Sequence, residues 1–411
     1  MDALNRGATY MHGGRFNKAI DAFTEAIRID PDLSAAYHNR GMALVEAGDL
    51  ERAIEEFTEM IARGMDDAGV FFGRALAYQE LGRQEEAVAD YGEAIARDPD
   101  YVDAYLNRGC IDDERGNTDE AVAAFSEAIR IDPNNVAAYV NRGISFSSAG
   151  DLEDAVGDYT KALRLDPSHA DIYVNRGLVY DEMDDHHRAI ADFTEAIRLD
   201  PKNAMAYINR GVALAAVGEL AEALADYNKA ARFDGENADV YVNRAGVHLQ
   251  MDAAQRAVID YTEALRLRPD DSDLYYLRGS AFHRANDLDM AIADFTRAIR
   301  LNAEDADAYL DRGLNYATKL EFRRAISDFD HAIKLKPEWA EAYTFRGLVH
   351  AGNGDLDKAI KDHSEAIRLD PASANAHFAR GGAYREKGDF DKAEADYELA
   401  EQLSEAEQAV S

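Results

Sequence analysis

Residues 136–169 read VAAYVNRGISFSSAGDLEDAVGDYTKALRLDPSH, and this stretch of 34 residues decides the fold. Its first half carries Tyr139, Gly143 and Phe146 at spacings of three and four residues. That spacing is typical of one face of an amphipathic helix. Gly150 interrupts the pattern, because glycine readily adopts the backbone conformations that end a helix. The first half therefore predicts one helix that stops near residue 150.

The second half of the stretch predicts another helix. Ala155, Tyr159 and Ala162 again follow the helical spacing. Pro167 ends the pattern, because its ring disfavours the α conformation at the residue before it. Small alanines that alternate with bulky aromatic side chains allow two helices to approach closely and interlock. The whole stretch is thus expected to form a pair of packed helices.

The pair recurs along the entire chain. All eight prolines lie at one phase of a 34-residue period: Pro31, Pro99, Pro133, Pro167, Pro201, Pro269, Pro337 and Pro371. Other residues fill the same phase in the gaps, namely Met65, Gly235, Ala303 and Glu405. A fixed period of this length indicates a repeat architecture. The predicted repeats are 1–33, 34–67, 68–101, 102–135, 136–169, 170–203, 204–237, 238–271, 272–305, 306–339, 340–373 and 374–407, followed by a tail at 408–411.

Each unit resembles the tetratricopeptide repeat. The residues that carry the resemblance in the quoted unit are Tyr139, Gly143, Ala155, Tyr159, Ala162 and Pro167. Alanine stands at position 20 of all twelve units, and the mild departures from the pattern are Met60, His363 and His377. The resemblance implies an all-α fold, a right-handed α-solenoid in which the first helix of each of about twelve repeats lines a concave groove.

Composition limits the classes of function. The formal net charge is −34, with 79 acidic and 45 basic residues, so the chain would repel the phosphates of nucleic acid. The acidity favours basic partners, or it serves only to keep a long molecule soluble. No stretch approaches 18 consecutive apolar residues, so no membrane contact is expected. The absence of a visible signal peptide and the single Cys110 suit a cytoplasmic location.

Arginine occupies position 7 of every unit. A charged side chain on the packed side of a helix requires a partner, and nine units carry Asp at position 23 while Glu56 adds a tenth carboxylate. We expect these side chains to form ion pairs between neighbouring helices, with the two-bond geometry that a guanidinium allows. The alternative is a cationic stripe for phosphate ligands, which the matched carboxylates would neutralise.

Asparagine recurs at position 6, at Asn39, Asn107, Asn141, Asn175, Asn209 and Asn243, with Asn5 in the first unit. Asparagine inside a helix is mildly unfavourable, because its side chain competes for backbone hydrogen bonds. An amide offers a donor and an acceptor together, which matches a peptide backbone. The series resembles the asparagine ladders of tetratricopeptide proteins that hold extended peptides. The alternatives are an asparagine that bonds to the neighbouring repeat, or one inherited through duplication.

Apolar residues accompany the unbroken part of this series at positions 5 and 9. The candidate binding residues among them are Val140, Ile144, Val174, Leu178, Ile208 and Val212. In the family, positions 2, 5, 6, 9, 12 and 13 usually face the groove. Here they carry 14 acids and only two bases, Arg284 and Arg385. Without lysines, the chain departs from family members that grip a C-terminal carboxylate, and a basic or amphipathic peptide is favoured.

Patterns of catalysis and metal binding are absent from the sequence. Residues 184–187 read DDHH, but the spacing is not that of a structural zinc site. No glycine-rich phosphate loop occurs, so no cofactor is expected. We therefore predict a non-enzymatic protein-interaction scaffold. Two alternatives remain open: a scaffold that self-assembles end to end into a homo-oligomer, and the recognition arm of a larger enzyme such as a glycosyltransferase, if the chain is a fragment.

Overall fold

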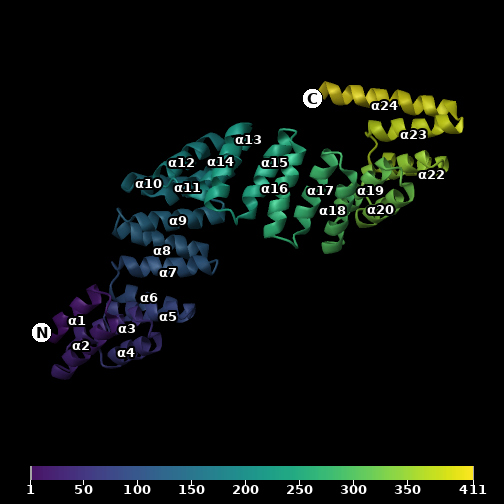
Figure 1. Ribbon diagram of the computed structural model, residues 1–411. Coiled ribbons are helices and arrows are strands. Elements are labelled where there is room, and N and C mark those ends of the chain that lie inside the picture. Colours follow the sequence, from purple (N-terminus) through teal and green to yellow (C-terminus); the bar gives the residue numbers. More distant parts are fainter. Residues whose placement is uncertain (1, 411) are drawn as a thin grey trace. The chain divides into compact units, whose positions relative to one another are not determined.

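The computed structural model describes the backbone of residues 2–410 and the side chains of residues 2–406. These residues form 24 α-helices and no β-strand (Figure 1). Successive helices form pairs, and a short turn joins the two helices of each pair. The all-α solenoid predicted from the sequence is therefore confirmed as the fold class. None of the described helices is long and apolar enough to span a lipid bilayer.

The chain divides into two compact units, Met1–Pro201 and Lys202–Ser411. In unit 1, each helix packs against the next helix along the chain. Its helices are α1 Asp2–His12, α2 Phe16–Ile29, α3 Ser34–Glu46, α4 Leu50–Ala62, α5 Ala68–Glu80, α6 Gln84–Arg97, α7 Val102–Glu114, α8 Thr118–Ile131, α9 Val136–Ala149, α10 Leu152–Leu165, α11 Ala170–Glu182 and α12 His186–Leu199.

Unit 2 is built in the same way from six further pairs. Its helices are α13 Ala204–Ala216, α14 Leu220–Phe233, α15 Ala238–Gln250, α16 Ala254–Leu267, α17 Ser272–Arg284, α18 Leu288–Leu301, α19 Ala306–Thr318, α20 Phe322–Leu335, α21 Ala340–Gly352, α22 Leu356–Leu369, α23 Ala374–Lys387 and α24 Phe390–Val410.

The pair α9–α10 shows how the sequence sets the helix ends. The side chain of Asn135 accepts a hydrogen bond from the amide of Ala138 and so caps α9 at its N-terminus. Gly150 ends α9 in the left-handed region at φ 84°, which glycine adopts without strain. Asp166, just before Pro167, is extended at φ −139° and ends α10. Local sequence therefore fixes the boundaries of both helices.

Two features hold the helices of a pair together at close range. The ring of Tyr159 lies so near Gly143 that a β-carbon there would come within 2.9 Å of it. Position 143 therefore accepts only glycine, unless the ring of Tyr159 shifts slightly. The alanines at position 20 are fully or almost fully buried in every repeat, with at most 3% of their surface exposed. Small residues thus permit the packing that the aromatic side chains fill.

Candidate functional site

The position-6 asparagines lie on the first helix of each pair. Asn39, Asn107, Asn141 and Asn175 belong to α3, α7, α9 and α11 of unit 1, and Asn209 and Asn243 belong to α13 and α15 of unit 2; all six are half-buried. The position-9 residues follow one helical turn later. We name the surface formed by positions 6 and 9 of these helices the ladder face of unit 1 in the first unit and the ladder face of unit 2 in the second, and we describe each separately.

Within unit 1, two of the amides are engaged by neighbouring side chains. Asn141 Nδ2 donates a hydrogen bond to Cys110 Sγ at 3.4 Å, in the preceding repeat. Asn107 interacts with the phenol of Tyr91, whose hydroxyl also donates to Gln79 Oε1 at 2.6 Å. The interpretation of the ladder as contacts between repeats therefore holds for these two positions.

The other amides of the ladder faces lack such partners. Cys110 precedes Asn141 by 31 residues. At the same distance before Asn175 and Asn243 the chain carries Ile144 and Val212, whose aliphatic side chains cannot accept a hydrogen bond. Among the described residues, no hydrogen bond is formed by the side chains of Asn175 and Asn243. Asn209 Nδ2 is buried without a hydrogen-bond partner. The amides of Asn175 and Asn243 therefore keep donors and acceptors for a ligand, whereas Asn209 Nδ2 is buried and out of a ligand's reach.

The candidate apolar residues separate into two groups by exposure. At position 9, Ile144, Leu178 and Val212 expose 39%, 42% and 37% of their surface. At position 5, Val174 and Ile208 expose only 7% and 6%, and Val140 is half-buried. Val174 and Ile208 therefore offer a ligand little surface, and their contact with a ligand stays a prediction. Both pack within the helical core, where they support the helix that carries the amides.

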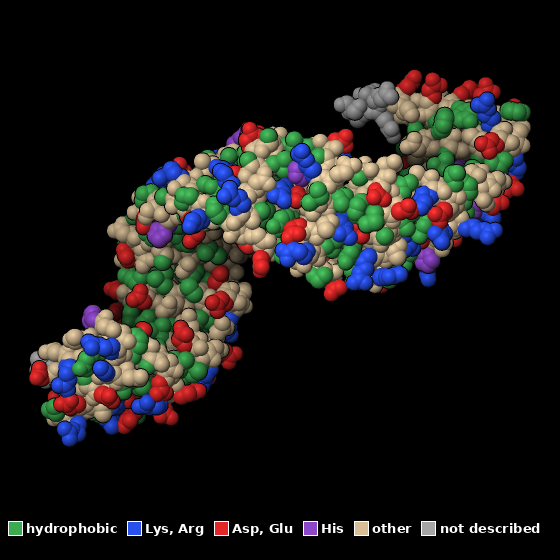
Figure 2. All heavy atoms as spheres, in the orientation of Figure 1, with side chains coloured by type: hydrophobic (Ala, Val, Ile, Leu, Met, Phe, Trp, Pro, Cys, Tyr) green, Lys and Arg blue, Asp and Glu red, His purple; other side chains and the backbone are tan. Residues whose placement is uncertain are grey.

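Acidic side chains near the ladder faces are partly compensated within the chain. Asp113 Oδ1 accepts a hydrogen bond from Ser145 Oγ at 2.7 Å, and Asp181 Oδ1 lies 2.8 Å from His186 Nδ1. In unit 2, Asp239 pairs with Arg268 at 2.8 Å. The sequence alone did not reveal these partners. On the visible surface, basic side chains are interspersed among the acidic ones (Figure 2).

The surroundings of Cys110 disfavour its reactive thiolate form. Burial raises the pKa of its thiol, and the neighbouring Glu114 and Asp113 raise it further. A raised pKa leaves little of the nucleophilic thiolate near neutral pH. No group of three or more potential metal ligands occurs among the described residues, and His186 of the DDHH stretch is engaged by Asp181. The cysteine therefore acts as a small acceptor for Asn141.

The position-7 arginines form the predicted ion pairs. Ten of them bind the carboxylate sixteen residues later, from the second helix of the same pair. In most repeats the arginine also donates to the side chain sixteen residues earlier, as Arg176 does to Thr160 Oγ1 at 2.9 Å. The sequence analysis missed this second partner. Hydrogen bonding to Asp192 raises the pKa of Arg176. Because these contacts tie the arginines to neighbouring helices, we expect their role to be structural.

Two arginines depart from this arrangement: Arg6, which has Ala22 sixteen residues later and pairs with Glu25 instead, and Arg108. The positions sixteen residues after and before Arg108 hold Ala124 and Gly92, which carry no acceptor. Its Nε lies 3.5 Å from Asp112 Oδ2, and neither atom makes a hydrogen bond. A β-carbon built on Gly92 would meet nothing within 4 Å, so a side chain could be accommodated at that position. Arg108 thus lacks the second-helix carboxylate of most repeats, and it lies in the repeat that begins the unbroken asparagine series.

The ladder changes character in the later repeats of unit 2. Position 6 holds Leu277, Asp311, Phe345 and Ala379 in succession. Asp311 Oδ2 accepts a hydrogen bond from the hydroxyl of Tyr276 at 2.9 Å, and burial raises the pKa of this carboxyl. Aliphatic, acidic and aromatic side chains have replaced the amides. The two regions therefore differ in the chemistry that they offer to a ligand.

The fold and the conserved spacing of these contacts define a tandem helical-repeat protein. A sequence profile described as Tetratricopeptide repeat matches residues 72–136, 174–238, 243–309 and 310–363. Further profiles with the same description match residues 4–33, 22–55 and 374–407. A profile described as TPR repeat matches residues 145–184 and 352–388. The chain belongs to the tetratricopeptide repeat family. Proteins of this family are commonly protein-interaction scaffolds. No curated protein sequence matches the chain.

Several solved structures are similar to parts of the chain. YrrB, described as a TPR protein with an unusual peptide-binding site, shares 29% identity over 45% of this chain and 95% of its own, with a TM-score of 0.40. A tetratricopeptide repeat protein from Parabacteroides merdae shares 20% identity over 60% of this chain and 98% of its own, with a TM-score of 0.47. Yeast Tom70 shares 19% identity over 98% of this chain and 91% of its own, with a TM-score of 0.40.

Proposed function

We propose that the protein is a non-enzymatic scaffold that binds an extended, net-basic or amphipathic segment of a partner protein on its ladder faces. The observation that carries the proposal is the coincidence, on the same helices, of exposed aliphatic side chains and amides that have no hydrogen-bond partner among the described residues. Asn175 and Leu178 on α11 illustrate it, because they lie one helical turn apart. An amide side chain can form hydrogen bonds with the backbone of a bound peptide, and exposed aliphatic side chains provide an apolar surface for the side chains of that peptide.

The acidic composition supports a basic ligand. Asp171 is exposed at position 2 of the repeat that carries Asn175, and the chain has an excess of acids over bases. Opposite charge steers the approach of a ligand more than it adds to final affinity. Because exposed charges are screened by salt, raising the ionic strength should weaken the complex. A cytoplasmic location and the absence of a cofactor remain part of this proposal.

The test removes amides that form no hydrogen bond with any residue that the structure describes. Wild type and a variant with Asn175→Ala and Asn243→Ala are immobilised and used to capture partners from a lysate of expressing cells. Two lost hydrogen bonds should weaken binding by roughly 1–3 kcal/mol, because each is worth about 0.5–1.5 kcal/mol net. Unchanged recovery of every captured protein would contradict the proposal.

The matched control changes two exposed asparagines away from the ladder faces. Asn17 and Asn134 are exposed, and the double variant Asn17→Ala and Asn134→Ala should capture partners like wild type. Thermal unfolding of all three proteins shows whether their stabilities agree. A self-assembling scaffold, the second candidate, would reveal itself by a concentration-dependent mass in sedimentation of the wild-type chain.

A further inference from the structure

The second helices of unit 2 expose an excess of basic side chains. In α14, α16, α18, α20 and α22, the exposed residues include twelve Lys or Arg and only four acids, although the whole chain has a net charge of −34. We name the exposed residues of these five helices the basic face. Figure 2 shows Lys and Arg side chains on the part of unit 2 that contains α16, α18 and α20. The charge of this surface is therefore opposite to that of the whole chain.

Replacement of one glutamate leaves three of these bases without a partner. In α16, Arg266 Nε donates to Glu263 Oε1 at 2.7 Å, one helical turn earlier. The equivalent residues in α14, α18 and α20 are not carboxylates but Lys229, Arg297 and His331. The bases one turn later form no ion pair with any described residue: Arg232, Arg300 and Lys334.

Most acids of the basic face are already compensated. Three of the four pair with bases outside these helices, as Asp330 does with Arg346 Nη1 at 2.6 Å. Glu222 is the fourth, and it forms no ion pair with a described residue. Seven exposed bases likewise form none within the described chain: Lys229, Arg232, Arg256, Arg300, Arg323, Lys334 and Lys361. Uncompensated positive charge therefore predominates on this surface.

Apolar side chains lie beside the three bases that lost their glutamate. The residue that follows each of them is apolar and exposed, namely Phe233 at 45%, Leu301 at 37% and Leu335 at 38%. In α16 and α22, where the arginine is paired, the equivalent Leu267 and Leu369 are half-buried. Charge and exposed apolar surface thus occur together in the same repeats, which favours an amphipathic ligand.

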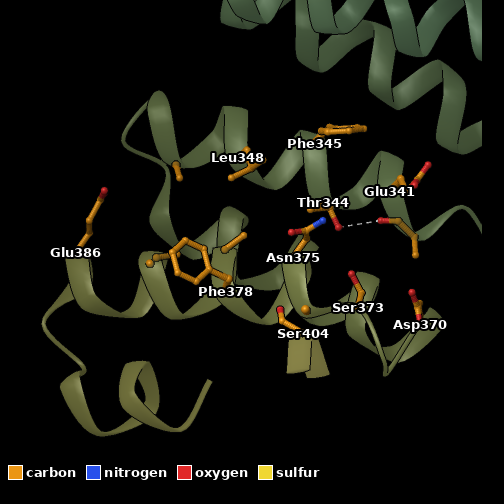
Figure 3. Close-up of a pocket in the computed structure, with 16 residues that line it drawn as sticks. Glu341, Thr344, Phe345, Leu348, Asp370, Ser373, Asn375, Phe378, Glu386 and Ser404 are labelled. Atoms are coloured by element: carbon orange, nitrogen blue, oxygen red, sulfur yellow. Dashed lines mark hydrogen bonds between the residues drawn. The ribbon is translucent and has the colours of Figure 1, made fainter. Parts of the chain in front are cut away.

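The first helices of the same unit expose acidic side chains instead. Glu341 of α21 and Glu386 of α23 lie around a cavity between first helices (Figure 3). The ladder face of unit 2 also lies on first helices, and the ligand proposed for it is basic. The basic face contains none of these residues. First and second helices of unit 2 therefore favour ligands of opposite charge.

The surrounding acidity favours a short ligand over a long polyanion. Exposed charges act over roughly 8–10 Å at physiological salt. A nucleic acid or an anionic membrane extends beyond the basic face and would be repelled by the acids on the rest of the chain. A short acidic segment contacts the basic face alone. Its apolar side chains can also cover Leu301 and Leu335, which an inorganic polyanion cannot do.

We propose that the basic face of unit 2 binds an acidic, amphipathic segment of a partner protein. Arg300 of α18 and Lys334 of α20 lie in successive repeats and form its central pair of bases. Arg300 can hold a carboxylate of the segment with two parallel hydrogen bonds. This binding differs in surface and in ligand charge from the binding proposed for the ladder faces, so either can fail without the other.

The experiment selects ligands by subtraction. A phage library of random twelve-residue peptides is first depleted on the immobilised full chain with Arg300→Glu and Lys334→Glu, which removes ligands of the ladder faces. The remaining phage are selected on wild type, and the expected consensus combines Asp or Glu with apolar residues. The labelled consensus peptide should bind the depletion variant about tenfold more weakly than wild type, because two attractive contacts become repulsive. Higher salt should weaken its binding to wild type.

Three further variants locate the effect. Arg284→Glu with Arg385→Glu changes the net charge equally at exposed residues of first helices, and should bind the peptide like wild type. Asn175→Ala with Asn243→Ala should also bind it unchanged. Arg300→Gln with Lys334→Gln removes charge without reversing it and should weaken binding about threefold. Circular dichroism verifies that every variant is folded.

Other outcomes would overturn the proposal. They are the absence of a consensus, a basic consensus, or an equal loss of binding in the variant with Arg284→Glu and Arg385→Glu. Tighter binding of a twelve-nucleotide single-stranded DNA or of phosphatidylserine vesicles, abolished by Arg300→Glu with Lys334→Glu, would assign the basic face to nucleic acid or to lipid. A wild-type dimer that the same two changes dissociate would assign it to a second copy of the chain.

Discussion

Arg142 and Asp158 form a two-bond ion pair between α9 and α10, with Nε 2.7 Å from Oδ2 and Nη2 2.8 Å from Oδ1. The same guanidinium donates through Nη1 to Ser126 Oγ of α8 at 2.8 Å. One side chain therefore connects three helices from two successive repeats. Both charged groups are largely buried, with 20% and 9% of their side chains exposed, so each depends on the other for compensation.

Removing this arginine should destabilise the repeats that it joins. In Arg142→Ala, the carboxylate of Asp158 and the hydroxyl of Ser126 lose their partner, which should cost about 1–3 kcal/mol. The loss should be local, because repeat proteins derive their stability from each repeat and its neighbours. Hydrogen exchange should accelerate in α8–α10 before it does elsewhere in unit 1.

Arg164→Ala is the matched control, because Arg164 is exposed on α10. It should change stability by less than about 0.5 kcal/mol. If Arg142→Ala instead leaves exchange and unfolding unaltered while it abolishes partner binding, the arginines belong to the ligand site.

Supplying the carboxylate that Arg108 lacks should stabilise unit 1. Ala124 stands where other repeats carry Asp, and the Nε of Arg108 has no hydrogen bond. In Ala124→Asp the new carboxylate can complete the two-bond pair, for a gain of about 1 kcal/mol. Denaturant unfolding, with exchange followed in α7 and α8, measures the gain.

The neutral variant Ala124→Asn serves as control for shape. It places a side chain of similar size at the same position but supplies no charge. Equal stability of the Asp and Asn variants would show that Arg108 gains nothing from a carboxylate there.

His363 should make unit 2 sensitive to acid. It replaces the aromatic residue of other repeats, is fully buried against Gly347, and neither ring nitrogen has a hydrogen-bond partner. Burial lowers the pKa of His363 from 6.5 to about 4. The unfolded chain therefore binds a proton between pH 6.5 and 4 that the folded chain excludes. This contribution to stability is fully present above pH 6.5 and declines by up to about 3 kcal/mol as the pH falls to 4.

The variant His363→Phe tests that sign. A phenyl ring fits, because Phe329 packs against Gly313 in the same way in the preceding repeat. Thermal unfolding of the variant should change less than that of wild type between pH 6.5 and 4. His187→Gln changes an exposed histidine and should follow wild type. Parallel pH profiles for wild type and His363→Phe would exclude His363 as the source of the acid sensitivity.

Much of the fold could be predicted because its determinants lie close together in sequence. Gly150 and Pro167 end their helices through their own backbone preferences, which need no knowledge of the neighbours. The pairing of Arg142 with Asp158 was also accessible, because a buried charge demands a partner and the two residues recur in step. These features depend on single residues or on one helix pair.

The features that escaped prediction depend on how one repeat packs on the next. Val174 carries an apolar side chain at a position expected to face a ligand, yet the packing of neighbouring helices buries it. The hydroxyl of Ser126 resembles any exposed serine in the sequence, and only the approach of α9 makes it a partner of Arg142. Likewise, Asn141 and Asn175 look alike, but Cys110 engages only the first.

The difference between positions 5 and 9 gives a test on a single helix. Leu178 is 42% exposed on α11, so Leu178→Ser should reduce ligand binding while it leaves stability nearly unchanged. A ligand that covers the exposed part of this side chain would gain about 1 kcal/mol from it.

Val174→Ala should have the opposite profile. Val174 is 7% exposed, so shortening it creates a cavity that should cost about 1–2 kcal/mol of stability, with little direct effect on binding. Thermal unfolding and the captured-partner assay, performed on both variants, separate the two effects. If Leu178→Ser lowers stability as much as Val174→Ala and captures partners as wild type does, the ladder face of unit 1 is a packing surface, and the ligand must bind elsewhere on the chain.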